Sequence, residues 1–200
     1  MKEEKINKAI EEIKNNTISS ETKQLITSIF FTFNEVIPKD IDAIIVIGSK
    51  DMNFKQVAKE YEKIKKPMIC TGGKPFLFLK EGEYYVEKLI KHKIPKQDIF
   101  LEDQSLNLEQ QLKYSFQLVL TRFSLQPSIL IMAAHYLLPV ISLVSNQLIE
   151  ENEWPITMTL HPIASKKINN SNWFSKKKTR MIIINELEKI VFSSKKKRPI

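Results

Sequence analysis

The chain has 200 residues, a formal net charge of +8 and 42% hydrophobic residues. This composition is ordinary for one globular domain, and it excludes collagen-like, low-complexity and disulfide-rich classes because there are only four glycines and one cysteine. The charge is uneven: residues 1–110 hold 18 basic and 18 acidic side chains, whereas residues 111–200 hold 13 and 5. The charged N-terminus lacks the apolar region of a secretory signal, which favours a cytoplasmic location.

The first 40 residues form a predicted N-terminal helical segment. Apolar side chains recur at helical spacing over residues 3–14 and again over residues 22–36. Neither stretch carries a chemical motif. We therefore expect both helices to cover a sheet.

From residue 41 the pattern alternates between short apolar runs and amphipathic helical stretches. The predicted strands are 42–47, 67–71, 98–101, 128–134 and 156–160. The predicted helices are 53–65, 82–92, 107–122, 137–149 and 176–192. This alternation predicts an α/β domain over residues 41–192, with a doubly wound, Rossmann-like and mostly parallel sheet of about five strands. Residues 193–200 are left as a basic tail.

One stretch without charges is long enough to cross a bilayer. It lies between Arg122 and Glu150. Pro127 and Pro139 divide it, and many polar residues interrupt it. We therefore predict a buried strand followed by a helix rather than a transmembrane helix.

Polar residues and glycines follow the predicted strands. They are Gly48 and Ser49 after the first strand, Thr71, Gly72 and Gly73 after the second, Glu102, Ser105 and Asn107 after the third, His135 after the fourth, and His161 after the fifth. Ligands of doubly wound sheets bind beyond the carboxyl ends of the strands. We expect these residues to converge on one edge and to form the candidate site.

Most of these residues have a structural interpretation beside the functional one. Gly72 and Gly73 predict either an anion-binding turn, with N–H groups directed at a ligand and Lys74 adding charge, or only a tight turn. Ser105 and Asn107 precede a helix, so either side chain is also a candidate helix cap.

His135 is the candidate group for proton transfer, because it follows the most apolar strand at the mouth of the expected site. The competing interpretation is a structural histidine. The sequence has no P-loop, no dinucleotide-binding glycine motif, no zinc-ligand spacing and no nucleophile elbow, so no metal site is predicted.

The ordered strand-end motifs resemble those of the YdcF-like family, an uncharacterised-domain family that also contains SanA and ElyC. The resemblance rests on Cys70-Thr71-Gly72-Gly73, on Glu83 at the start of a helix, on the run Leu101-Glu102-Asp103-Gln104-Ser105-Leu106-Asn107, and on the segment around His135. It covers about residues 42–145.

The resemblance implies a bacterial protein of the family's soluble branch, with a Rossmann-like domain and a polar pocket at the strand ends. It implies a small phosphorylated or nucleotide-like ligand, for example S-adenosylmethionine, with Glu83, Glu102, Ser105 and Asn107 orienting its polar part. Gln110 and Leu138 depart from the family pattern, which has Glu and commonly Arg at these positions. We therefore expect ligand binding, while the reaction, if there is one, stays open.

The alternative function is a non-catalytic interaction module that uses its basic C-terminal region on an anionic membrane or on nucleic acid. Ten of the basic side chains lie in two clusters, at 166–180 and 195–198. No aromatic residues alternate with the lysines of the tail, so specific nucleic-acid binding is not expected.

Overall fold

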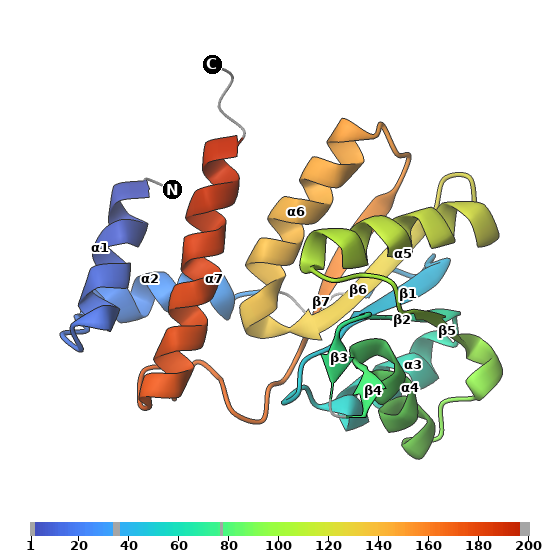
Figure 1. Ribbon diagram of the computed structural model, residues 1–200, viewed down its shortest axis with the longest axis horizontal. Coiled ribbons are helices and arrows are strands. Elements are labelled where there is room, and N and C mark those ends of the chain that lie inside the picture. The colour runs from blue at the N-terminus through green and yellow to red at the C-terminus, as the bar shows by residue number, and fades with distance from the viewer. Residues whose placement is uncertain (1–2, 34–36, 77, 197–200) are drawn as a thin grey trace.

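The computed structural model describes residues 3–33, 37–76 and 78–196. Figure 1 shows an α/β domain on one side and a group of helices on the other. The helical group contains α1 (Glu3–Lys14), α2 (Ser20–Phe30) and α7 (Lys177–Lys196).

A five-stranded parallel sheet forms the centre of the α/β domain. Its strands are β1 (Ala43–Ile47), β2 (Met68–Thr71), β5 (Ile99–Glu102), β6 (Ser128–Ala134) and β7 (Thr157–Ile163). Their spatial order is β5-β2-β1-β6-β7. The chain therefore winds outward from β1 in one direction and then, from β6, in the other, which confirms the predicted doubly wound, Rossmann-like fold. The carboxyl ends align, since Ile47 lies opposite both Thr71 and Ala133.

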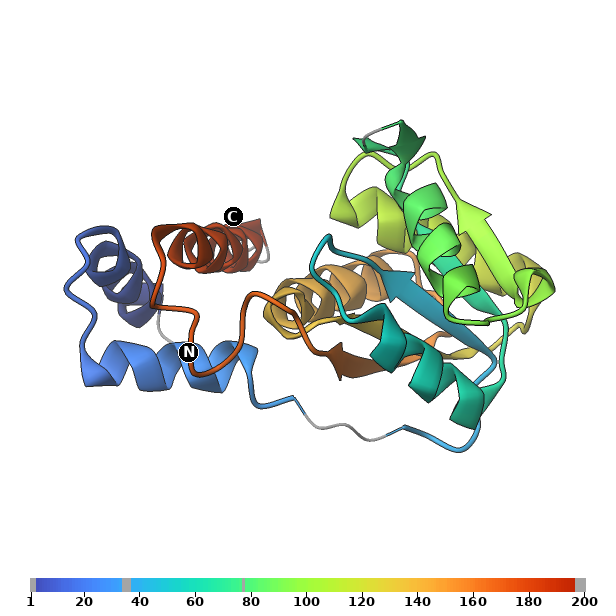
Figure 2. The same cartoon turned by 90° about the horizontal axis from the view of Figure 1, so that it is seen from below.

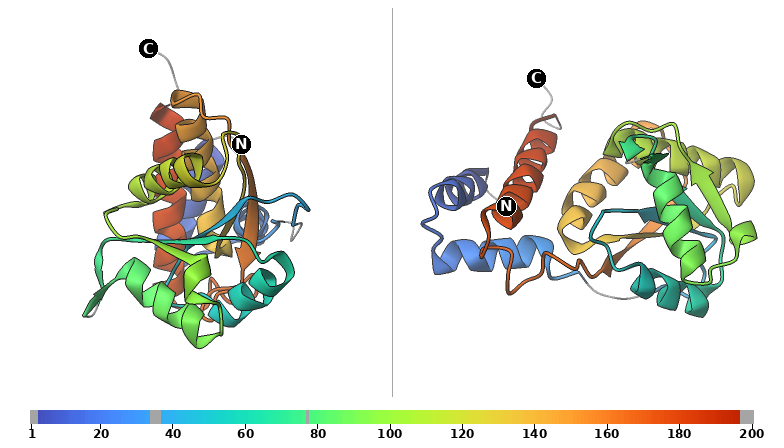
Figure 3. Two further views of the ribbon diagram at one scale, coloured as in Figure 1. Left: turned by 90° about the vertical axis from the view of Figure 1, so that its right-hand side faces the viewer. Right: turned by 60° about the horizontal axis from the view of Figure 1, so that its bottom comes forward.

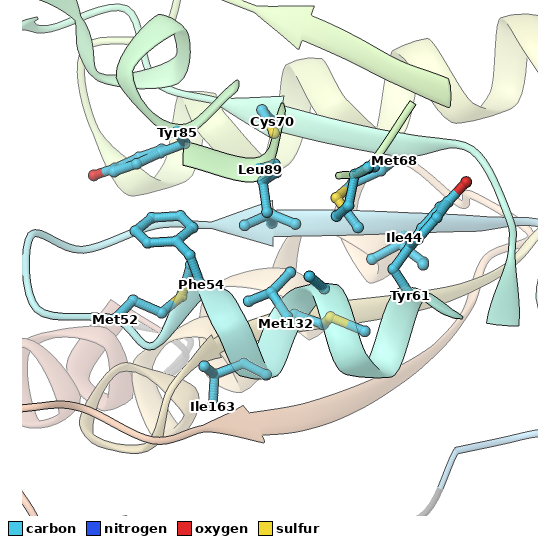
Figure 4. Close-up of a cluster of buried hydrophobic side chains, with 14 of the residues drawn as sticks. Ile44, Met52, Phe54, Tyr61, Met68, Cys70, Tyr85, Leu89, Met132 and Ile163 are labelled. Atoms are coloured by element: carbon cyan, nitrogen blue, oxygen red, sulfur yellow. The ribbon is translucent and has the colours of Figure 1, made fainter. Parts of the chain in front are cut away.

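Four helices cover the two faces of this sheet (Figure 2). They are α3 (Phe54–Ile64), α4 (Glu81–Lys91), α5 (Leu108–Arg122) and α6 (Leu138–Glu151). Alternate residues of a strand point to opposite faces. Ile44 (Figure 4) and Val46 accordingly belong to the core with α3 and α4. Ile45 and Ile47 belong to the core with α5 and α6. Burial on both faces explains why the central strands β1, β2 and β6 are nearly continuous apolar runs.

The N-terminal helices do not cover the sheet, contrary to our expectation. Their apolar faces pack with α7 and α6 in a separate core that includes Ile13, Phe30, Trp173 and Ile183. Figure 3 shows α7 standing between α1 and α6. Both faces of the sheet are already covered by α3 to α6, which leaves α7 as the partner for α1.

Several boundaries differ from the predictions. The second helix ends at Phe30, and residues 34–36 of its predicted span lie outside the described part of the chain. β7 continues to Ile163, so His161 lies within a strand and is buried instead of following one. Pro162 is tolerated there because β7 is an edge strand.

The short strands and 3₁₀ turns of the structure were not predicted from the sequence. β3 (Pro75–Phe76) and β4 (Leu79–Lys80) form an antiparallel hairpin, and two 3₁₀ turns, η1 (Lys96–Asp98) and η2 (His135–Leu137), precede β5 and α6. Two-residue strands are too short for any periodicity to reveal them.

The uncharged stretch folds as predicted, into β6 and α6. Within the described residues, no helix is both long and apolar enough to cross a membrane. α7 extends to Lys196, and residues 197–200 of the predicted basic tail lie outside the described part. Membrane or nucleic-acid contact by this tail stays a prediction.

Candidate functional site

The polar residues after β2 and β5 come together, but they bind one another. The Glu102 carboxylate is buried and accepts hydrogen bonds from the backbone N–H groups of Gln104 (2.8 Å) and Ser105 (2.9 Å). Its other oxygen accepts from the Ser105 hydroxyl at 2.6 Å and from the Thr71 hydroxyl. All four bonds are internal, so this cluster is a closed network.

The two adjacent glycines serve the same network. The N–H of Gly72 donates to the Glu102 carbonyl (2.9 Å), and the N–H of Gly73 donates to the Ser105 carbonyl (2.8 Å). Gly72 has a φ of +142°, which strongly favours glycine. A Cβ at Gly73 would collide with the backbone of Asp103. The glycines thus allow two loops to approach closely, and their N–H groups are not directed at a ligand, contrary to that expectation.

Glu83 and Asn107 cap helices. The Glu83 carboxylate accepts from the backbone N–H of Lys80 at 2.7 Å, at the start of α4. Asn107 Oδ1 accepts from the N–H of Gln110 at 2.9 Å, at the start of α5. The Gln110 side chain in turn accepts from the N–H of Leu106 (2.7 Å), so this departure from the family pattern has a structural use.

A second buried network follows β1, at the point where the strand order reverses. The Asp51 carboxylate accepts from the hydroxyls of Ser49 (3.0 Å), Tyr136 (3.1 Å) and Ser165. Burial raises the pKa of the Tyr136 hydroxyl, so this group donates to Asp51 throughout the physiological range. The network joins the loops after β1, β6 and β7.

Gly48 and Ser49 of this region were predicted site residues, whereas Asp51, the central carboxylate, was not among them although it follows the same strand. Asp51 lies two residues after Ser49, and this proximity was the available signal. Gly48 is needed for packing, because a Cβ there would collide with the Tyr85 ring.

His135 follows β6 as predicted and begins the turn η2. It is partly buried, and its ring centroid lies 6.2 Å from that of Phe31, directly after α2. The ring therefore packs toward the helical group. This placement favours a structural histidine over a catalytic one.

An open pocket of about 680 Å³ lies between the α/β domain and α7. Its described lining residues are Lys74, Asn107, Leu108, Glu109, Val140, Val144, Asn185, Glu186, Glu188, Lys189, Phe192 and Ser193. Lys74 follows β2, Asn107 follows β5, and Val140 lies in the first turn of α6, after β6 (Figure 1). The pocket is thus at the carboxyl edge of the sheet, and Asn107 is the predicted site residue that lines it.

The pocket lining carries two ammonium groups and three carboxylates, and one of the carboxylates is buried. The N-terminus of α5 carries the positive end of the helix dipole, and Lys74 and Lys189 add ammonium groups. Glu186 is buried, and its Oε1 accepts a hydrogen bond from Lys189 Nζ at 2.6 Å. Burial raises the pKa of the Glu186 carboxyl. Glu186 and Lys189 belong to a weaker part of the resemblance to YdcF-like proteins, but they were not predicted as site residues, because they lie more than 50 positions from His135 along the chain.

Two other reactive residue types can be placed. Cys70 is fully buried in β2, and burial raises the pKa of its thiol, which makes it inert. Among the described residues, no group of three or more His, Cys, Asp or Glu side chains could hold a metal ion.

Comparison with known proteins adds no family assignment. No protein-family model matches the chain, and no curated protein matches its sequence. The resemblance to YdcF-like proteins therefore stays a prediction, and function has to be argued from geometry.

Proposed function

We propose that the protein binds a small phosphorylated or nucleotide-like ligand in the pocket between α5, α6 and α7. The pocket supports this proposal by its position at the carboxyl edge of a doubly wound sheet, where such folds bind ligands. Its volume of about 680 Å³ lies within the range of roughly 300–1,000 Å³ typical of small-molecule sites.

The two ends of the pocket suit the two parts of such a ligand. A phosphate fits the first turn of α5, where the helix dipole favours an anion beside the N–H of Gln110 that Asn107 caps. Lys74 and Lys189 add positive charge at the same pocket, which offsets the carboxylates of its lining. Leu108, Val140 and Val144 supply apolar contact for a base or another flat group.

This proposal keeps the resemblance to YdcF-like proteins but changes the roles of the strand-end residues. The closed network of Glu102, Thr71 and Ser105 fixes the loops that carry Lys74 and Asn107. S-adenosylmethionine remains a candidate within the nucleotide-like class, because it carries an adenosyl group. His135 has no role in this binding, and no reaction is proposed.

The test is a thermal-shift and calorimetric screen of nucleoside phosphates, sugar phosphates and S-adenosylmethionine. Lys74→Met should weaken binding of the phosphorylated ligands about tenfold to hundredfold, the amount expected from losing one charged hydrogen bond. Lys91→Met, an exposed lysine at the end of α4, is the matched control and should bind normally. Failure of every ligand to bind, or normal binding by Lys74→Met, would contradict the proposal.

A further inference from the structure

A glutamate that lines the pocket has one carboxylate oxygen that is buried from solvent and has no hydrogen-bond partner among the described residues. It is Oε2 of Glu186, on a side chain that is only 6% exposed. The other oxygen, Oε1, is held by Lys189. Leu187 and Ile190, its neighbours on α7, belong to the core of the helical group, and apolar atoms cannot replace the lost hydration.

Such a group destabilises the protein unless something binds it. A buried acceptor without a donor retains its full desolvation penalty, and an apolar side chain of similar size is often neutral or stabilising at such a position. Burial accordingly raises the pKa of Glu186. An acid in a cleft whose pKa is perturbed by burial is a candidate for ligand contact.

A ligand group that donates a hydrogen bond to Glu186 Oε2 is more favourable if it is neutral than if it is charged. Lys189 already places one ammonium group 2.6 Å from the carboxylate, so a second cation would be repelled. A neutral hydroxyl donates a hydrogen bond without that repulsion. The terminal torsion of a glutamate is soft, and the contact with a ligand requires the carboxylate to rotate about it, because Oε2 is inaccessible to solvent in this structure.

Building on the proposed function, we propose that Glu186 selects for a hydroxyl group, and that the ligand is a sugar phosphate or the ribose phosphate of a nucleotide. The phosphate lies at the N-terminus of α5 with Lys74 and Lys189. A sugar hydroxyl donates to Glu186 Oε2. Inorganic phosphate and simple alkyl phosphates satisfy only the first of these two contacts.

Isothermal titration with ribose 5-phosphate and butyl phosphate tests this selection, because both carry a phosphate monoester and only one carries hydroxyls. We expect the native protein to prefer ribose 5-phosphate by about tenfold or more. Glu186→Leu should lose this preference while still binding butyl phosphate. Glu186→Gln keeps one acceptor oxygen, so it should retain part of the preference and serves as a second variant if the leucine protein folds poorly.

The matched control is Glu87→Gln, at an exposed position of α4 that does not belong to the pocket lining. This variant should keep the full preference. Urea unfolding supplies an independent readout: Glu186→Leu should be at least as stable as the native protein, whereas a structural glutamate would lose stability on replacement.

The outcomes separate this inference from the proposed function. Equal binding of the two ligands by the native protein, or an unchanged preference in Glu186→Leu, overturns the role of Glu186 and leaves phosphate binding intact. Marked destabilisation of both Glu186 variants also overturns it. Absence of binding by either ligand in the native protein overturns both proposals.

Discussion

The Glu102 carboxylate accepts hydrogen bonds from three residues at the carboxyl edge of the sheet. The bonds join the end of β2 to the loop after β5. A buried carboxylate is tolerated when each of its oxygens is paired in this way. The network therefore holds the two loops together beneath the pocket. Substitution of Glu102 should lower the free energy of unfolding before it affects ligand binding.

Glu102→Gln should lower the free energy of unfolding by about 2–4 kcal/mol. The glutamine NH₂ group would face the donors of Ser105 or Thr71, and at least one buried donor would lose its acceptor. Urea unfolding monitored by fluorescence measures this difference. Glu87→Gln, at an exposed position of α4, should stay within about 0.5 kcal/mol of the native protein, and an equal effect of the two variants would contradict the assigned network.

The residues at the sheet edge were predictable from sequence, but the direction of their hydrogen bonds was not. Gly73, Glu83 and Asn107 all lie where the alternating pattern places them. Caps, tight turns and ligand sites use the same residue types, because all of them need short polar side chains or glycine. Only the folded geometry shows that Asn107 Oδ1 faces its own helix and that the N–H of Gly73 faces Ser105.

At the scale of elements, a carboxylate joins the two N-terminal helices. Glu12 in α1 accepts a hydrogen bond from the backbone N–H of Ser19 at 3.0 Å. Ser19 is the N-cap of α2, and its hydroxyl accepts from the N–H of Thr22 at 3.1 Å. The hydrogen bonds from Ser19 lower the pKa of Glu12 to about 2.

This lowered pKa predicts a loss of stability in acid. The folded-state pKa lies below the unfolded value of about 4.3, so the contribution of Glu12 is complete above about pH 5 and is lost as the pH falls to about 2. Glu12→Gln should therefore have a lower thermal midpoint than the native protein at pH 6, and the difference should shrink toward pH 2.5. Scans at several pH values measure it.

Glu11→Gln is the control for the hydrogen bond between Ser19 and Glu12. The Glu11 side chain is 66% exposed and only approaches Lys14 at 3.7 Å, so its replacement should change the midpoint little at any pH. A Glu12→Gln difference that is constant between pH 6 and pH 2.5 would show that the bond to Ser19 does not hold the charged carboxylate.

Elements with clear periodicity were predicted and the others were not. The five strands and α3 to α6 have long apolar patterns, which fix their type even where the ends shift by one to three residues. The hairpin β3–β4 depends instead on a tertiary contact, since Lys80 Nζ binds Asp103 at 2.7 Å beyond β5. The partner of α1 was likewise decided by packing, because an apolar helix face does not specify whether a sheet or another helix covers it.

At the scale of the whole molecule, two of the three cores meet at α6. Its residues contribute both to the core beneath the sheet and to the core of the helical group. The pocket lies where these two parts face each other across α5, α6 and α7. A ligand there would contact both parts at once and would couple the helical group to the α/β domain.

Hydrogen exchange detects this coupling. Saturating ribose 5-phosphate, at about 100 times its dissociation constant, should slow exchange through local opening by up to about a hundredfold in peptides from the first turns of α5 and from residues 185–193 of α7. Peptides from α3 should be unaffected, since α3 packs in the core on the opposite face of the sheet. Protection confined to α5 and α6 would place the ligand on the α/β domain alone. Equal protection across the chain would reflect global stabilisation and would contradict a bridge between α5 and α7.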